Sequence, residues 1–394
     1  MANWGLSQEL RNVAASSACL VAVYLGFPKL PRGWPRLVFL LPALVVFALV
    51  PFSIRSHILR STLSFLLLWV CPAKLLLRCW DIVIDYPIQG FLYFCLTSVL
   101  PVNVKGRSIP TDETWYRTSL FFHLLHLFGL FATLNALWFM EGTSGWFDHA
   151  SYCLLVYFGA EGILGILSEL ASLLLSVEVH PLFNNPFSAS SLSDFWGRRW
   201  NLFVSSLIRE TVYNPILIAL SGGRQQYGAK VSSSCSDISK GNFRPERDIC
   251  RLNSGVEGYA AANSLMPEND VRHFSPSTLQ ARAVAMFLSF LASGLMHELI
   301  FCAITQKAAT WEVTCFFVLH GVASILEVFV RRKFLVRKIL PKPIAIFCTL
   351  GFVFFSAAWL FMPPIIRSGI DLQLIAEFRQ VQDVIVGLLT RQTN

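Results

Sequence analysis

Five long stretches of the chain contain no charged residue, and this feature limits the possible folds more than any other. Each stretch is close to the length of a membrane-spanning helix, which is roughly 17 to 25 residues. Because polar backbone groups cannot stay unpaired in hydrocarbon, and because these stretches lack the alternation of barrel strands, we expect helices. The stretches are Asn12–Pro28, Leu37–Ile54, Tyr86–Val104, Thr118–Met140 and Pro343–Ile366.

Further apolar segments carry one or two polar interruptions and extend the same pattern. Only 14% of the residues are charged and 54% are hydrophobic, whereas soluble domains carry about 25% charged residues. We therefore predict an all-α fold, a polytopic integral membrane protein with about eight to ten transmembrane helices. The interrupted segments are Ser61–Leu77, Ala150–Ser176, Leu202–Leu220, Arg282–Gln306 and Glu312–Val330.

The charged residues indicate both the topology and the division of the chain. An excess of Lys and Arg marks cytosolic loops, which predicts that the basic cluster within 331–342 is cytosolic. Tracing the helices backwards gives Leu202–Leu220 cytosolic flanks at both ends, so we expect a re-entrant or surface-lying helix there. Four parts result: N-terminal transmembrane helices (1–176), a cytosolic-side segment (177–221), a polar loop (222–276) and C-terminal transmembrane helices (277–394).

The ten cysteines form no Cys-x-x-Cys pair and most lie inside apolar stretches. This distribution argues against a disulfide framework or a zinc site. We expect free thiols and no metal centre.

Two histidines lie well inside late apolar stretches and are candidates for chemistry. An ionisable side chain inside a membrane helix is costly and often functional. His297 is followed directly by Glu298, and His320 precedes Glu327 by seven residues, which is two helical turns. A neutral imidazole suits the removal of a proton from an attacking hydroxyl. The alternative is that either histidine only bonds a neighbouring helix.

A second candidate is the segment 195–201, which reads FWGRRWN. Trp196 and Trp200 flank Arg198 and Arg199, and Asn201 supplies an amide that can steady negative charge on a carbonyl oxygen. Trp favours the boundary of a membrane and guanidinium groups match phosphate oxygens. Coenzyme A carrying a fatty acyl chain has the corresponding phosphates and apolar tail. The alternative is that the arginines anchor a helix end to anionic lipid.

These segments resemble the signature of the plant wax-synthase-like family in the membrane-bound O-acyltransferase superfamily. The resemblance rests on Pro181–Phe187 continuing into Ser191–Asn201, on Ser293–Ile300, and on Leu319–Gly321 through Glu327. The later Ala357–Phe361 is similar too. The resemblance covers roughly 181–367 and implies an MBOAT-like helical core. The polar stretch 222–276 departs from it and resembles an insertion.

The resemblance implies that His297 is the catalytic histidine and Asn201 the polar residue of the cytosolic-side motif. It also implies an enzyme of the endoplasmic reticulum membrane that uses acyl-CoA as a co-substrate and no cofactor. In this interpretation Glu298 orients the imidazole, His320 and Glu327 line the acceptor cavity, and Trp196, Arg198, Arg199 and Trp200 bind acyl-CoA. Membrane lipids surround the protein, and no nucleic-acid partner is expected.

The predicted function is transfer of a fatty acyl group from acyl-CoA to a lipid hydroxyl, with a long-chain fatty alcohol as the first choice of acceptor. A sterol or diacylglycerol acceptor stays open. A transporter is the alternative from another class, because Glu161 and Glu169 with the membrane histidines can form an ion or proton relay. A non-catalytic scaffold is the third.

Overall fold

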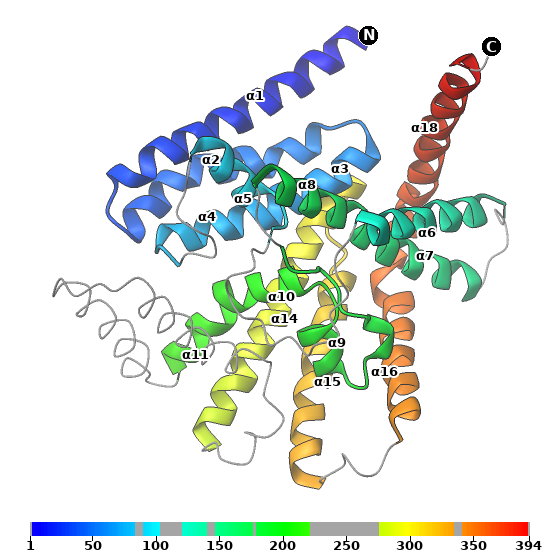
Figure 1. The fold of residues 1–394 in the computed structure, drawn as a ribbon. Helices are drawn as coiled ribbons and strands as arrows, with labels where there is room; N and C mark the ends of the chain where they lie inside the picture. The colour runs from blue at the N-terminus through cyan, green and yellow to red at the C-terminus, as the bar shows by residue number, and fades with distance from the viewer. Residues whose placement is uncertain are drawn as a thin grey trace.

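The computed structural model describes residues 2–82, 90–102, 120–139, 146–175, 179–220, 276–334 and 341–392. The regular elements in this part of the chain are helices, which confirms the predicted all-α fold (Figure 1). Seven helices there are long and apolar enough to cross a membrane. Large apolar side chains point outward from them, including Phe128, Phe347 and Trp359, which are 66, 79 and 69% exposed. An outer surface of this kind suits lipid.

Seven of the ten predicted apolar segments coincide with these seven helices. The segments starting at Leu37, Ser61 and Thr118 correspond to Trp34–Ser53, His57–Cys79 and Phe121–Phe139. The remaining four correspond to Asp148–Leu175, Leu279–Thr305, Glu312–Arg331 and Lys342–Ser368.

The other three predicted segments do not correspond to any of these seven helices. Asn12–Pro28 lies mostly in α1 (Ala2–Gly26), which is not among the seven helices. The prediction of a span over Tyr86–Val104 is wrong at its end, because helix α5 (Phe91–Val99) stops five residues earlier. Leu100 is extended there, as a residue before proline prefers to be.

In the N-terminal part, α1 packs against α2 (Trp34–Ser53) and α5, and both α2 and α5 pack against a composite helix made of α3 (His57–Ser64), η2 (Phe65–Val70) and α4 (Cys71–Cys79). A short 3-10 turn, η1 (Phe27–Lys29), follows α1. The core of this part is apolar, with Leu40, Phe47 and Leu75 fully buried. Helix α6 (Leu120–Phe139) pairs with a second composite helix, α7 (Trp146–Gly159), η3 (Ala160–Leu164) and α8 (Gly165–Leu175).

The segment predicted to lie on the cytosolic side contains a short turn, η4 (Pro186–Ser188), the helix α9 (Leu192–Arg198), and a helix over 202–220 composed of α10 (Leu202–Ile208), η5 (Arg209–Tyr213) and α11 (Asn214–Leu220). This last helix is also outside the seven membrane-spanning candidates. It lies beside the N-terminal half of α14 (Pro276–Thr305) in Figure 1. The predicted polar loop, 222–276, falls almost wholly outside the described residues.

The C-terminal part is built on an antiparallel pair, α14 and α15 (Glu312–Phe334). The two backbones approach closely at Gly294, where an added Cβ would lie 3.1 Å from the Thr314 Cα. Small residues such as glycine allow close helix contacts of this kind in membrane proteins. After α15 come α16 (Lys342–Ser356), η7 (Ala357–Phe361), α17 (Pro363–Ser368) and α18 (Ile370–Gln392).

Four of the described segments are π-helical turns, and three of them end two residues before a proline. The turns η2, η5 and η7 precede Pro72, Pro215 and Pro363. Proline has no N–H to donate and its ring clashes with the carbonyl four residues earlier. The turn absorbs this defect by widening, as shown by the i to i−5 bond from Met362 N to Ala357 O at 2.9 Å. Such turns are frequent at functional sites.

Candidate active site

His297 lies in α14, and the carbonyl of the preceding helical turn holds its imidazole. Nδ1 is 2.8 Å from the Ser293 carbonyl oxygen. Because a carbonyl only accepts, Nδ1 carries the proton of the neutral ring and the lone pair is on Nε2. Nε2 makes no hydrogen bond with any residue that the structure describes. His297 therefore offers a proton acceptor with a fixed tautomer, which a general base requires.

Three aromatic rings from separate elements enclose His297. Phe317 of α15 stacks on the imidazole with ring centroids 4.3 Å apart. Trp69 of η2 and Phe361 of η7 present T-shaped contacts at 4.8 and 5.9 Å. Two of the three rings thus come from π-helical turns. The enclosure fixes the imidazole plane and surrounds it with apolar groups, which strengthens electrostatic interactions at the site.

Glu298 does not orient the imidazole, which corrects the sequence-based prediction. Its Oε1 accepts from the backbone N–H groups of Thr310 and Trp311 at 2.8 and 2.7 Å. Its Oε2 accepts from the backbone N–H and the hydroxyl of Thr314, both at 3.2 Å. Consecutive helical residues point about 100° apart, so Glu298 faces the start of α15 instead. It acts as a helix cap supplied by a neighbouring helix.

His320 is fully buried, and both of its ring nitrogens are engaged. The Trp196 indole N–H donates to Nδ1 at 3.0 Å. Nε2 then carries the proton and donates to the Ser356 hydroxyl at 2.8 Å. Because an indole only donates, this tautomer is also fixed. This arrangement agrees with the alternative interpretation, in which His320 only bonds neighbouring helices. Its ring joins α9, α15 and α16.

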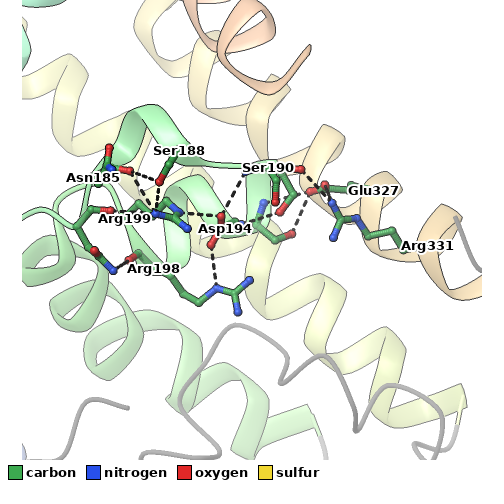
Figure 2. A network of polar contacts seen from close by, with 11 residues as sticks. Asn185, Ser188, Ser190, Asp194, Arg198, Arg199, Glu327 and Arg331 are labelled. Carbon is green, nitrogen blue, oxygen red and sulfur yellow. Dashed lines mark hydrogen bonds and ion pairs between the residues drawn. The ribbon is translucent and has the colours of Figure 1, made fainter. Parts of the chain in front are cut away.

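Glu327 is likewise a connecting residue (Figure 2). Its Oε2 accepts from the backbone N–H and the hydroxyl of Ser193 at 3.1 and 3.2 Å. Its Oε1 pairs with Arg331 one turn later at 2.9 Å. These contacts fix the start of α9 to α15, so Glu327 positions the FWGRRWN segment.

The two arginines of that segment have different surroundings, as Figure 2 shows. Arg199 donates to Asp194 at 2.7 Å, to Ser188 at 2.6 Å and to two loop carbonyls at 3.3 Å. Arg198 pairs with Asp194 only through Nε, at 3.1 Å, and its side chain is 45% exposed. Its two terminal nitrogens make no hydrogen bond with the described residues. Of the two, Arg198 has the donors left for a further ligand, and Arg199 braces the loop.

The two tryptophans of the segment lie in an aromatic cluster. Trp196 contacts Phe317, the ring stacked on His297, at 5.8 Å. Trp200 stacks on Phe195 with centroids 5.3 Å apart and meets Phe183 edge-on at 5.1 Å. The cluster therefore connects the segment to the His297 enclosure through Phe317 and, by way of Phe316, through Phe361.

Asn201 is the N-cap of α10. It adopts a left-handed backbone conformation with φ 37°, which asparagine tolerates better than most residues. Its Oδ1 accepts from the Val204 N–H at 3.1 Å, so the amide NH2 is directed away from the helix end. No hydrogen bond joins Asn201 to His297 in the described residues.

The sequence analysis did not identify Trp69, Phe361 or Ser293. Trp69 and Phe361 each lie in a π-helical turn that ends two residues before a proline. That proline is the sequence signal by which both residues could have been found. Within the described residues, no group of three His, Cys, Asp or Glu side chains is arranged to hold a metal ion.

Comparison with known proteins bears on the same residues. The sequence profile of the "Membrane bound O-acyl transferase family" matches residues 179–234 and 259–319, which include the FWGRRWN segment and His297. The profile matches both ends of the polar stretch 222–276 and leaves 235–258 unmatched, so the predicted insertion is narrower than the whole stretch.

Several plant enzymes are similar over nearly their whole length. "Long-chain-alcohol O-fatty-acyltransferase" of Simmondsia chinensis is 30% identical over 95% of this chain and 95% of its own. "Probable long-chain-alcohol O-fatty-acyltransferase 6" of Arabidopsis thaliana is 30% identical over 92% of both chains. "Acyl-CoA--sterol O-acyltransferase 1" of Arabidopsis thaliana is 26% identical over 89% and 88%. Together with the fixed histidine and the motifs around it, these likenesses show that the chain belongs to the membrane-bound O-acyl transferase family.

Proposed function

We propose that this multi-pass O-acyltransferase moves a fatty acyl group from acyl-CoA to the hydroxyl of a long-chain alcohol, giving a wax ester. The observation that carries the proposal is His297 of α14, whose Nε2 makes no hydrogen bond with the described residues and whose imidazole lies in an aromatic enclosure. The relatives named for long-chain alcohols support the choice of acceptor. The endoplasmic reticulum membrane is the proposed location.

The reaction needs one proton acceptor and no covalent intermediate on the protein. Nε2 of His297 takes the proton from the acceptor hydroxyl while that oxygen attacks the thioester carbonyl. The tetrahedral intermediate collapses and expels the thiolate of coenzyme A, which takes the proton back from the imidazolium. One C–O bond forms, one C–S bond breaks, and the products are an ester and free coenzyme A.

Two residues of the FWGRRWN segment assist in this scheme. The Asn201 amide donates to the carbonyl oxygen as negative charge develops there, a contribution of the oxyanion-hole type. Arg198 binds a phosphate of the CoA moiety through the terminal nitrogens that its pairing with Asp194 leaves available. Acyl-CoA enters from the cytosol and the alcohol from the bilayer.

The test measures ester formation in microsomes from a host without its own neutral-lipid acyltransferases. Labelled palmitoyl-CoA is supplied with hexadecanol, and His297→Gln is compared with wild type and with His126→Gln at matched expression. His126 is a matched control because its Nδ1 also bonds the carbonyl four residues earlier, at 2.6 Å, on another membrane helix.

Loss of a general base costs about 10² to 10⁴ in rate, so His297→Gln abolishes the product while His126→Gln retains it. Equal activity of wild type and His297→Gln contradicts the mechanism.

A sterol is the second candidate acceptor, because one relative is named an acyl-CoA sterol O-acyltransferase. The same microsomes, given an equimolar mixture of hexadecanol, sterol and diacylglycerol, distinguish the acceptors by the migration of the labelled product. Sterol ester as the main product would replace the long-chain alcohol in the proposal. Transport of label across proteoliposomes with no ester formed would instead favour the transporter alternative.

A further inference from the structure

The three rings around His297 lie at different distances from it. Phe317 and Trp69 pack directly on the imidazole, with ring centroids 4.3 and 4.8 Å away. Phe361 meets it edge-on at 5.9 Å, farther than either. Carbon atoms in contact are about 3.5 to 4.0 Å apart, so the two closer rings leave no layer for a substrate between themselves and the imidazole. The reacting groups therefore meet the imidazole on the side of Phe361.

The same side of the enclosure is the more open one. Trp69 and Phe317 are each 3% exposed, whereas Phe361 and His297 both keep partial exposure. Phe361 ends the π-helical turn η7, inside a helix that is long and apolar enough to cross a membrane. Its ring is consequently the part of the enclosure that an entering substrate touches.

Other rings hold Phe361 in place. Phe301 meets it edge-on with centroids 5.1 Å apart, and Phe316 is tilted against it at 5.2 Å. Phe301 also lines a cavity of about 140 Å³ between α14 and α17, and it makes no ring contact with His297 among the described residues. Phe361 is therefore a supported wall of the His297 site, while Phe301 belongs to the same cluster but faces the cavity.

The carbon that bears the attacking hydroxyl has to lie beside this wall. In a primary alcohol that carbon carries one chain and two hydrogen atoms. In a secondary alcohol, including a sterol, it carries two carbon branches, and the second branch also needs about 3.5 to 4.0 Å to the nearest ring carbon. A close-packed pocket distinguishes substrates that differ by one methylene by about 10- to 200-fold. A supported ring in this place consequently favours a primary hydroxyl.

We propose that Phe361 selects the class of acceptor: its ring leaves room beside His297 for the hydroxyl of a primary alcohol and excludes that of a secondary alcohol. Phe361 is thereby a specificity-determining residue of the acceptor site. The inference rests on the proposed transfer to an alcohol, and it narrows the acceptor to primary alcohols. Sterols become poor acceptors for this enzyme.

The experiment uses the full-length protein in nanodiscs, given palmitoyl-CoA and an equimolar mixture of hexadecan-1-ol and deuterium-labelled hexadecan-2-ol. The two alcohols have the same carbon number and differ in the position of the hydroxyl. Phe361→Leu and Phe361→Trp are compared with wild type. Phe301→Leu is the matched control, because it removes a neighbouring ring on the side of the cavity.

The two esters are quantified by mass spectrometry in a single reaction. Their ratio does not depend on the amount of folded protein, so a loss of stability alone leaves it unchanged. We expect wild type to form mainly the primary ester. Phe361→Leu raises the ratio of secondary to primary ester by about tenfold or more, Phe361→Trp lowers it, and Phe301→Leu leaves it as in wild type.

Several results would overturn the selection. They are a ratio that neither Phe361 variant changes, an equal rise in Phe301→Leu, and a wild type that prefers the secondary alcohol. If only one Phe361 variant is active, its ratio decides. If neither forms ester while wild type does, Phe361 is needed for more than selection and the proposal falls.

The activity of wild type distinguishes failure of this inference from failure of the proposed function. No ester from either alcohol overturns the proposed reaction, and the selection falls with it. An active wild type whose ratio does not respond at Phe361 overturns the selection alone.

Discussion

Replacing Glu298 with glutamine tests whether this residue serves the imidazole or the start of α15. The carboxylate accepts four hydrogen bonds, two on each oxygen, from Thr310, Trp311 and Thr314. An amide substitutes NH2 for one oxygen, so two of the four donors lose their acceptor. At about 1.5 to 3 kcal/mol for each bond to a charged group, the expected loss is roughly 3 to 6 kcal/mol. Trp311, held at φ 65°, loses its restraint as well.

The assay is thermal unfolding of the detergent-solubilised protein, followed by the rate of ester formation per folded molecule across a pH series. Glu312→Gln is the control, since Glu312 is also acidic and in the first turn of α15 but pairs with Arg367 at the surface. We expect Glu298→Gln to unfold several degrees below both wild type and the control, with an unchanged pH dependence. An unaltered unfolding temperature together with a shifted pH profile would refute the capping role and restore the role as orienting partner of His297.

Three further predictions concern the packing around the site. Gly294→Ala places a methyl 3.1 Å from the Thr314 backbone, and we expect about 1 to 3 kcal/mol of destabilisation and a lower rate, measured by unfolding and turnover. Arg199→Lys cannot reproduce several bonds at once, so limited proteolysis should cut the loop that it braces faster than in wild type. Ser356→Ala leaves the buried His320 N–H without an acceptor, which costs about 1 to 3 kcal/mol of unfolding free energy. An unfolding temperature equal to wild type contradicts the first and third predictions.

The membrane helices were predictable because hydrocarbon imposes one requirement on every spanning segment. Apolar length alone identified seven of them, and charged interruptions within Leu202–Leu220 separated that helix from the rest. The predicted span ran past Leu100 because it was based on hydropathy, which takes no account of the backbone conformation that each residue prefers. Pro101 ends the helix although the apolar sequence continues.

His297 was predictable because an ionisable residue in an apolar stretch is conspicuous. The role given to Glu298 failed because neighbours in sequence point to different sides of a helix. The difference between Arg198 and Arg199 depends on which of them reaches Ser188, and spacing carries no information about that. Tertiary contacts therefore supply the part of the site that motifs do not.

The π-helical turns make the active site depend on chain length as well as on residue identity. Each turn contains one residue more than an α-helix needs for the same bonding pattern, so it is equivalent to a one-residue insertion. Removing a single residue from η2 or η7 would leave a helix but rotate one side of it by about 100° relative to the other. The rings of Trp69 and Phe361 would then no longer both face His297. Homologous sequences aligned without gaps at these turns would place the wrong side chains against the imidazole of His297.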